Sequence, residues 1–278
     1  MAKKENEQDD FWNEEGGERW VENIDRLENM ISNLSDHLLA RAAPSAGESV
    51  LDIGCGGGIT SAALAAAVGP RGEVLGADIS ETILKVARSR YENIANLKFT
   101  TADAEVFSFV PQNYDLITSR FGVMFFASPN AAFRNIHQTA KPSGRMVYIC
   151  WRTLVENPWM GAPAAAAFTV LPPPEKPEPG TPGPFSLADP KLTTKIMADA
   201  GFRDIKFTPV DEPVNLGEIE PVLHFMTTMG PAAEPLKSAT DADREAALAA
   251  MRVTLEQHNT KDGVIMPSAI WVVEAKTH

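Results

Sequence analysis

The sequence predicts an α/β protein with a doubly wound, mostly parallel sheet. Between residues 49 and 151, short apolar runs alternate with segments of helical periodicity, and the first run ends in a cluster of glycines. Strands that alternate with helices of this length are typical of βαβ units and a parallel sheet. Right-handed crossovers then place the helices on both faces of the sheet.

Each expected element follows from its local pattern. Apolar runs predict strands at 49–53, 73–77, 97–101, 114–118, 145–151, 204–210 and 268–275. Periodic apolar residues predict helices at 60–68, 81–91, 131–141, 190–200 and 242–257. Gly201 directly follows the fourth of these helices, which is a common position for a helix-ending glycine.

Composition divides the chain into five segments. We expect a disordered, charged head at 1–10, a helical lid at 11–45, a ligand-binding core at 46–151, a proline-rich cap insertion at 152–189, and the end of the core sheet at 190–278, which includes a helical insertion at about 215–260. Two tryptophans, Trp12 and Trp20, flank the pair Gly16-Gly17 near the start of the lid segment. That pattern fits either ordinary packing on the sheet or a hinged aromatic lid that closes on a ligand.

The net charge and the number of cysteines indicate which binding partners and which compartment to expect. The formal net charge is −12 and the pI is about 4.9, so the chain should repel nucleic acid and anionic membrane surfaces. Cys55 and Cys150 are too few for a disulfide framework, which favours a reducing cytoplasm. No run of about 18 apolar residues predicts a membrane span. We expect a small-molecule partner and either a monomer or a homodimer.

A glycine loop carries the strongest functional signal. The strand Val50–Ile53 runs into Gly54-Cys55-Gly56-Gly57-Gly58 and then into a helix. Glycines allow a sharp turn and a close approach of a ligand to the backbone, and the helix adds free N–H groups and a positive dipole end. This arrangement predicts a nucleotide-like ligand, although a tight turn without a ligand is the alternative.

The loop does not match the common nucleotide fingerprints. The dinucleotide pattern needs a third glycine where Ile59 or Ser61 stands, and no P-loop sequence is present. Asp78 ends the second strand, 20 positions after Gly58, where a carboxylate can accept both hydroxyls of a ribose.

Four features in register resemble the class I S-adenosylmethionine-dependent methyltransferases. They are the loop Asp52–Gly58, Asp78, the segment 102–104 after the third strand, and the segment 140–144 before the fifth. The similarity is greatest to the branch of the ubiquinone/menaquinone-biosynthesis C-methyltransferases and many bacterial small-molecule methyltransferases. It covers residues 48–150 well and the strands after residue 200 loosely. It implies a Rossmann-like sheet of seven strands with an antiparallel last strand, and it makes 46–151 an S-adenosylmethionine-binding core.

The resemblance also implies roles for the loop. Gly54, Gly56 and Gly58 would line the methionine part of the cofactor. Asp52 would orient the loop and help to hold the cofactor's ammonium group. Ser119, just past the fourth strand, would border the methionine end.

Other positions would bind the rest of the cofactor. Asp78 would bind the ribose hydroxyls, and Ile79 would pack on the adenine. Asp103 would accept a hydrogen bond from the adenine amine, with the Ala104 backbone against the ring. Asp103 also fits a helix N-cap. If the lid interpretation holds, Trp20 covers the cofactor.

Candidate catalytic residues are fewer. Arg120 would border the methionine end and the substrate, although a structural ion pair is an equal alternative. His224 lies in an apolar stretch of the late insertion and is the histidine that we expect to face the pocket as a base. No cluster of ligand-spaced His, Asp or Glu predicts a metal. The sequence therefore predicts a cytoplasmic methyltransferase for a small, largely apolar acceptor at O or C. The alternatives are a nucleotide-binding oxidoreductase and a cofactor-binding protein without catalysis.

Overall fold

A central sheet organises the chain in the computed structural model, which describes residues 2–175, 178 and 180–277. Its strands are β1 (Ser49–Ile53), β2 (Glu73–Asp78), β3 (Leu97–Thr101), β4 (Tyr114–Arg120), β5 (Ala140–Trp151), β6 (Arg203–Asp211) and β10 (Ala269–Lys276). Their order is β3-β2-β1-β4-β5-β10-β6. Strand β10 runs antiparallel to β5 and to β6, and the pairs among β1 to β5 are parallel. The predicted fold class is confirmed.

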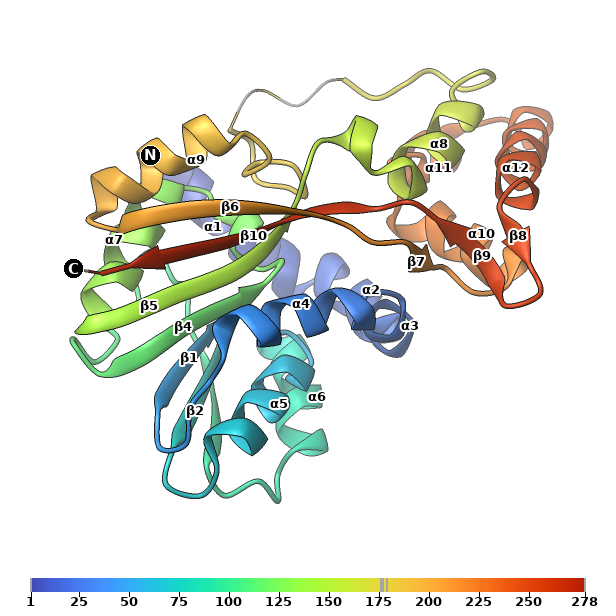
Figure 1. Cartoon of the computed structure of the whole chain (residues 1–278). Coiled ribbons are helices and arrows are strands. Elements are labelled where there is room, and N and C mark those ends of the chain that lie inside the picture. Colours follow the sequence, from blue (N-terminus) through green and yellow to red (C-terminus); the bar gives the residue numbers. More distant parts are fainter. Residues whose placement is uncertain (1, 176–177, 179, 278) are drawn as a thin grey trace.

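Helices cover both faces of this sheet (Figure 1). Helices α4 (Ser32–Ala42) and α5 (Ile59–Val68) lie on one face, and α7 (Pro129–Thr139) and α9 (Pro190–Ala200) lie on the other. Helix α6 (Glu81–Arg90) follows β2. Leu38 of α4 and Leu116 of β4 are fully buried in the core between them. The sheet therefore places the ends of β1, β2 and β4 side by side at one edge.

The N-terminal segment is helical from its start. It forms α1 (Ala2–Asn13), α2 (Glu15–Glu22) and α3 (Ile24–Met30) before α4. Met1 lies outside the described residues. Alanine, lysine, glutamate and glutamine, which are frequent in this stretch, all have high helix propensity. The disordered head expected at 1–10 stays a prediction.

Helix α1 docks on the start of α6. Ser80 Oγ donates to the Trp12 carbonyl oxygen at 2.5 Å and also caps α6 by accepting from the Ile83 amide. Asn13 Oδ1 accepts from the Glu81 amide at 2.8 Å, so a side chain of α1 satisfies a free N–H of α6. A Cβ on Gly17 would lie 2.0 Å from the Trp12 carbonyl oxygen. The turn between α1 and α2 therefore requires a glycine.

Two insertions form a cap at one end of the molecule. The first contains the short helices η2 (Leu154–Glu156) and α8 (Pro158–Ala167), and its residues 176, 177 and 179 lie outside the described part of the chain. The second contains α10 (Ile219–Met229), α11 (Ala233–Ser238) and α12 (Asp241–Glu256). Helix α8 packs against α12, so the two insertions meet (Figure 1).

A second, small sheet was not expected from the sequence. It consists of β7 (Val214–Asn215), β9 (Gly263–Met266) and β8 (Asn259–Thr260), and it flanks the helices of the second insertion. Strands of two to four residues are too short for an alternating pattern to become visible. Within the described residues, no helix has the length and apolar character that crossing a bilayer requires.

The docking of the N-terminal helices can be tested at Gly17. We expect Gly17→Ala to push α1 away from α2 and α6, because the new methyl group meets backbone rather than a flexible side chain. Thermolysin should then cleave the first 23 residues several-fold faster than in the wild type. Glu18→Ala, an exposed change in the same helix, is the matched control. Equal cleavage rates for all three proteins would contradict this docking.

Candidate functional site

A cavity of about 530 Å³ opens at the carboxyl ends of the central strands. Its floor is the glycine loop with the ends of β2 and β4, its roof is the N-terminal helices, and its far wall comes from the cap insertions. A volume between about 300 and 1,000 Å³ is usual for cofactor and small-molecule sites. This is also the edge at which open α/β sheets bind their ligands.

Two glycines shape the floor of the cavity. Gly54 and Gly56 have φ angles of 64° and 53°, a region that residues with a Cβ rarely adopt. A Cβ on Gly54 would lie 2.6 Å from Gly122 Cα, so the loop and the segment after β4 are in close contact. Both Gly54 and Gly56 line the cavity as predicted, together with Gly57.

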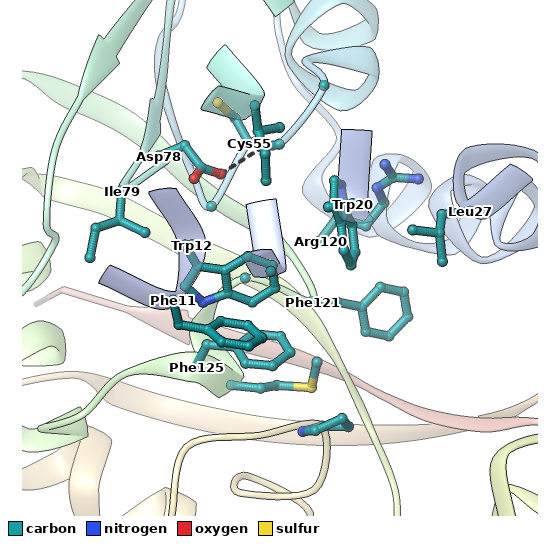
Figure 2. A pocket seen from close by; sticks show the side chains of 18 of the residues that line it. Phe11, Trp12, Trp20, Leu27, Cys55, Asp78, Ile79, Arg120, Phe121 and Phe125 are labelled. Carbon is teal, nitrogen blue, oxygen red and sulfur yellow. Dashed lines mark hydrogen bonds between the residues drawn. The ribbon is translucent and has the colours of Figure 1, made fainter. Parts of the chain in front are cut away.

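Asp78 connects the glycine loop to the end of β2. Its Oδ2 accepts from the Gly56 amide at 2.8 Å, and its Oδ1 accepts from the Ser80 amide at 2.9 Å (Figure 2). Burial raises the pKa of this carboxyl, and these backbone hydrogen bonds oppose the rise. A carboxylate has about four acceptor positions. Asp78 therefore retains acceptor capacity for a hydroxyl group of a ligand in the cavity.

Asp52 lies under the loop at the end of β1. It is fully buried, and its two oxygens accept from the Ser61 hydroxyl at 2.6 Å and from the Thr118 hydroxyl at 3.1 Å. Burial raises its pKa to about 6, although both hydrogen bonds lower it. Asp52 thus holds β1, β4 and α5 together directly beneath the cavity.

The residues that we expect to bind the adenine lie together in the cavity wall. Ile79, Asp103 and Ala104 all line the cavity. Asp103 Oδ1 accepts from the Glu105 amide at 2.9 Å, and no helix begins there, so the residue caps a turn instead of a helix. Its Oδ2 accepts no hydrogen bond from the described residues. The Asp103 side chain is therefore available to an amine in the cavity.

Two predicted lining residues lie behind the wall. Gly58 has a φ of 84° and precedes α5, where a Cβ would lie 2.8 Å from the Phe99 ring. It faces the protein interior because the loop has already turned into the helix. Ser119 is fully buried, and its Oγ accepts from the amides of Gly122 and Val123, both at 3.2 Å. Neither residue lines the cavity, and their predicted place beside the cofactor stays a prediction.

The N-terminal segment contributes an aromatic cluster to the roof. Trp20 lines the cavity as predicted, and its ring lies 5.8 Å from the ring of Trp12, which in turn lies 5.2 Å from that of Phe125. Phe11 packs edge-on against Trp12 at 5.1 Å. Figure 2 shows the rings of Phe11, Trp12 and Phe125 grouped together, below Cys55 of the glycine loop in this view. Of the segment 11–45, residues between Phe11 and Ile31 line the cavity, while α4 packs on the sheet.

Of the two candidate catalytic residues, one lines the cavity and the other does not. Arg120 ends β4, lines the cavity, and donates from Nη1 to Ser35 Oγ at 3.2 Å. His224 is exposed on α10 and does not line the cavity, so the prediction that it faces the pocket is wrong. Its neighbours Leu223 and Phe225 are buried instead, because the apolar stripe of α10 turns the histidine outward.

The cavity has further lining residues, and those from α3 and α10 carried no separate signal in the sequence. The further lining residues come from α3, from η1 (Val123–Phe125), from the end of β5 and from the cap: Leu27, Glu28, Met30, Met124, Trp151, Trp159, Phe225 and Met229. In sequence, the residues of α3 and α10 show helical periodicity, which is the same signal that core residues give. The aromatic residues past the strand ends were the better candidates for an apolar pocket from sequence alone, because strand ends face ligands in such sheets.

Comparison with known proteins identifies the central domain. Residues 50–144 match a family described as "Methyltransferase domain". A ubiquinone/menaquinone biosynthesis C-methyltransferase of Escherichia coli is 33% identical over 129 residues, which cover 45% of this chain and 51% of the relative. The domain belongs to the class I S-adenosylmethionine-dependent methyltransferases. The chain spans about half the length of the curated relatives that it matches, and the domain family is one that binds S-adenosylmethionine.

Solved structures agree on the fold. The YcgJ protein of Bacillus subtilis has a TM-score of 0.59 at 17% identity, covering 88% of this chain and 97% of that one. Phosphoethanolamine N-methyltransferase 2 of Haemonchus contortus, solved with S-adenosyl-L-methionine, has a TM-score of 0.54 at 19% identity, covering 88% of this chain and 53% of that one. Within the described residues, no group of His, Cys, Asp and Glu is arranged to hold a metal ion. The expectation of a metal-free site stays a prediction.

The raised pKa of Asp52 predicts a specific dependence of stability on pH. The folded-state pKa of about 6 exceeds the usual 3.8, so ionisation of Asp52 disfavours the folded state. Its stabilising contribution is full below pH 3.8 and is lost as the pH rises through 6. We expect the free energy of unfolding of the wild type, minus that of Asp52→Asn, to fall by about 1–3 kcal/mol between pH 4 and pH 7. Urea denaturation across this range measures the difference.

Asp115→Asn is the control with the opposite sign. Burial raises the pKa of Asp115, but hydrogen bonds from Lys141 and the Ser49 amide outweigh it and leave the pKa lowered. The corresponding difference for Asp115 should therefore stay flat from pH 5 to pH 7 and decrease only at more acidic pH. Parallel curves for the wild type and Asp52→Asn would refute the assignment to Asp52.

Proposed function

We propose that this chain is an S-adenosylmethionine-dependent methyltransferase that methylates O or C of a small, largely apolar acceptor. One observation carries the proposal: a single cavity joins a polar half, formed by the glycine loop and Asp78, to an aromatic half beyond the end of β4. A methyltransferase needs these two environments next to each other, because the donor is a nucleoside and the acceptor must meet its methyl group.

The polar half fits the cofactor. Asp78 has acceptor capacity left for a ribose hydroxyl, and Ile79 offers an apolar face for the adenine. Asp103 lies on the next strand end, within the same wall, where its carboxylate suits an exocyclic amine. Gly54, Gly56 and Asp52 lie below the methionine end. This fit supports the cofactor roles proposed for these residues.

The aromatic half fits an apolar acceptor. Phe121 stacks on Trp151 with ring centroids 4.3 Å apart and an interplanar angle of 13°, and Trp159 lies 5.2 Å from Trp151. Phe121 has a φ of 63°, a rare conformation that turns its ring away from the direction of the strand. Strain of this kind at a strand end is common in functional sites. The wall is suited to a flat ring or a lipid-like chain.

Methyl transfer requires that the acceptor be aligned with the methyl group and that water be excluded from the site. When bound, S-adenosylmethionine supplies a methyl group on a positively charged sulfur. The described lining residues include no histidine. We therefore infer that this chain works by aligning the acceptor and by excluding water with the aromatic roof and wall, without a histidine base.

The remaining expectations accompany this proposal. We propose a cytoplasmic protein that acts as a monomer or a homodimer and binds no nucleic acid. The net charge of −12 supports the absence of nucleic acid, and the burial of both unpaired cysteines is compatible with a reducing compartment. The methyltransferase-domain match weighs against a nucleotide-binding oxidoreductase. A methyl-transfer assay distinguishes the proposed methyltransferase from a cofactor-binding protein without catalysis.

The cofactor assignment can be tested by calorimetry with S-adenosylhomocysteine. We expect the wild type to bind it and Asp78→Ala to bind it at least about 10-fold more weakly, since the carboxylate is lost. His224→Ala is the control and should bind as the wild type does. A wild-type chain that binds neither S-adenosylhomocysteine nor S-adenosylmethionine would refute the proposal. Normal binding without methyl transfer to any of a broad acceptor set would favour the non-catalytic alternative.

A further inference from the structure

The indole N–H of Trp159 has no hydrogen-bond partner in the apolar wall of the cavity. Trp159 is the second residue of α8, is 6% exposed and lines the cavity. Its Nε1 is buried, and no acceptor among the described residues receives its proton. By contrast, Nε1 of Trp271 on β10 donates to the Ala188 carbonyl oxygen at 3.0 Å. Buried indole N–H groups usually have such a partner, so the free donor of Trp159 points to a partner outside the protein.

Trp159 is fixed from the central sheet and from the cap. Asn157, which directly precedes α8, is fully buried; its Nδ2 donates to the Ala269 carbonyl oxygen at 3.0 Å, and its Oδ1 accepts from the Ala269 amide at 2.9 Å. These bonds fasten the start of α8 to β10, while α8 also packs against α12 (Figure 1). The ring of Trp159 lies 5.2 Å from that of Trp151. A side chain held in this way keeps its N–H at one position, which a specificity-determining contact requires.

A ligand in the cavity can supply the missing acceptor atom. Phe121, Met124 and Phe225, which line the same half of the cavity, have no side-chain hydrogen-bond donor of their own. A single donor in an apolar wall orients an otherwise apolar ligand that carries one polar atom. An anion such as a phosphate group would instead be bound by several donors or by a charged side chain. The wall therefore suits an uncharged acceptor with an oxygen at one place on its ring.

An oxygen on the ring also agrees with the proposed chemistry. A methyl group transferred to O needs an oxygen nucleophile, and one transferred to a ring carbon needs a ring that an oxygen substituent has made electron-rich. We propose that the acceptor is a flat, otherwise apolar ring compound that bears an oxygen, and that Trp159 Nε1 donates a hydrogen bond to this oxygen. This inference rests on the proposed function. It makes Trp159 a specificity-determining residue that orients the acceptor, and Asn157 the residue that positions it.

The probes 1-tetralone and tetralin differ by one carbonyl oxygen and test the contact. Trp159→Phe keeps an aromatic ring in the wall and loses the N–H group. Titration calorimetry of chains saturated with S-adenosylhomocysteine gives the Kd of each probe. We expect the ratio of the tetralin Kd to the tetralone Kd to fall about 5- to 20-fold in Trp159→Phe, the range for a hydrogen bond to a buried donor. The tetralin Kd itself should change less than about 3-fold.

Trp271→Phe is the matched control. It removes an indole N–H that is already paired with Ala188 and that belongs to a residue outside the cavity lining, so it should keep the wild-type ratio. A second readout needs no variant in the site. In ¹H–¹⁵N NMR spectra of the wild type, the indole proton of Trp159 should move downfield when 1-tetralone binds and should not do so when tetralin binds, because only the ketone accepts a hydrogen bond.

The outcomes separate this inference from the proposed function. An unchanged ratio in Trp159→Phe, or an equal fall of the ratio in Trp271→Phe, overturns the inference and leaves the methyltransferase assignment intact. If Trp159→Phe binds neither probe, the NMR signal of the wild type decides: a downfield shift with 1-tetralone alone supports the contact, and its absence overturns it. If the wild type binds S-adenosylhomocysteine but neither probe, the apolar acceptor of the proposed function is refuted together with this inference.

Discussion

The hydrogen bond from the Gly56 amide to Asp78 Oδ2 joins the ends of β1 and β2, and the cavity depends on it. It holds the loop in positive-φ conformations that only glycine adopts readily. The contact between Gly54 and Gly122 then fixes the exit of β4 against the same loop. These two contacts hold the ends of β1, β2 and β4 around the cavity. Any side chain at Gly54 would separate them and close the floor on which a ligand must rest.

The roof is built on the same strand ends. Ser80 and Glu81, directly after Asp78, hold Trp12 and Asn13 of α1 through hydrogen bonds. The residues that follow the proposed ribose-binding carboxylate are thus the ones that dock the aromatic segment over it. Binding of a nucleoside and coverage of the cavity are connected through a few neighbouring residues. Water exclusion, which methyl transfer requires, therefore depends on the packing of α1 and α2 as well as on the cap.

Most of the core fold and the cofactor half were predictable, because both depend on local patterns. Apolar runs that end in glycine or aspartate indicated β1 and β2, and the positions of Asp78 and Asp103 at strand ends follow from chain order. His224 failed because its local pattern does not say which side of α10 is buried. Gly58 and Ser119 lie outside the cavity lining, because the sequence pattern does not show which way the backbone turns at these positions.

The sequence indicated aromatic residues past the strand ends as candidates for the acceptor half, but not how this half is put together. Phe121, Trp151, Trp159 and Phe225 come from four separate elements that meet only when α8 and α10 pack over the sheet. Nothing in the spacing of the sequence indicates that meeting, since each residue lies in an apolar stretch that equally fits the core.

A crystal structure of the chain with S-adenosylhomocysteine tests the central claim most directly. The account predicts the nucleoside across the ends of β1, β2 and β3, with a ribose hydroxyl on Asp78 and its sulfur facing the wall formed by Phe121 and Trp151. A ligand bound with its ribose away from Asp78, or outside the cavity between the glycine loop and Trp20, would contradict it.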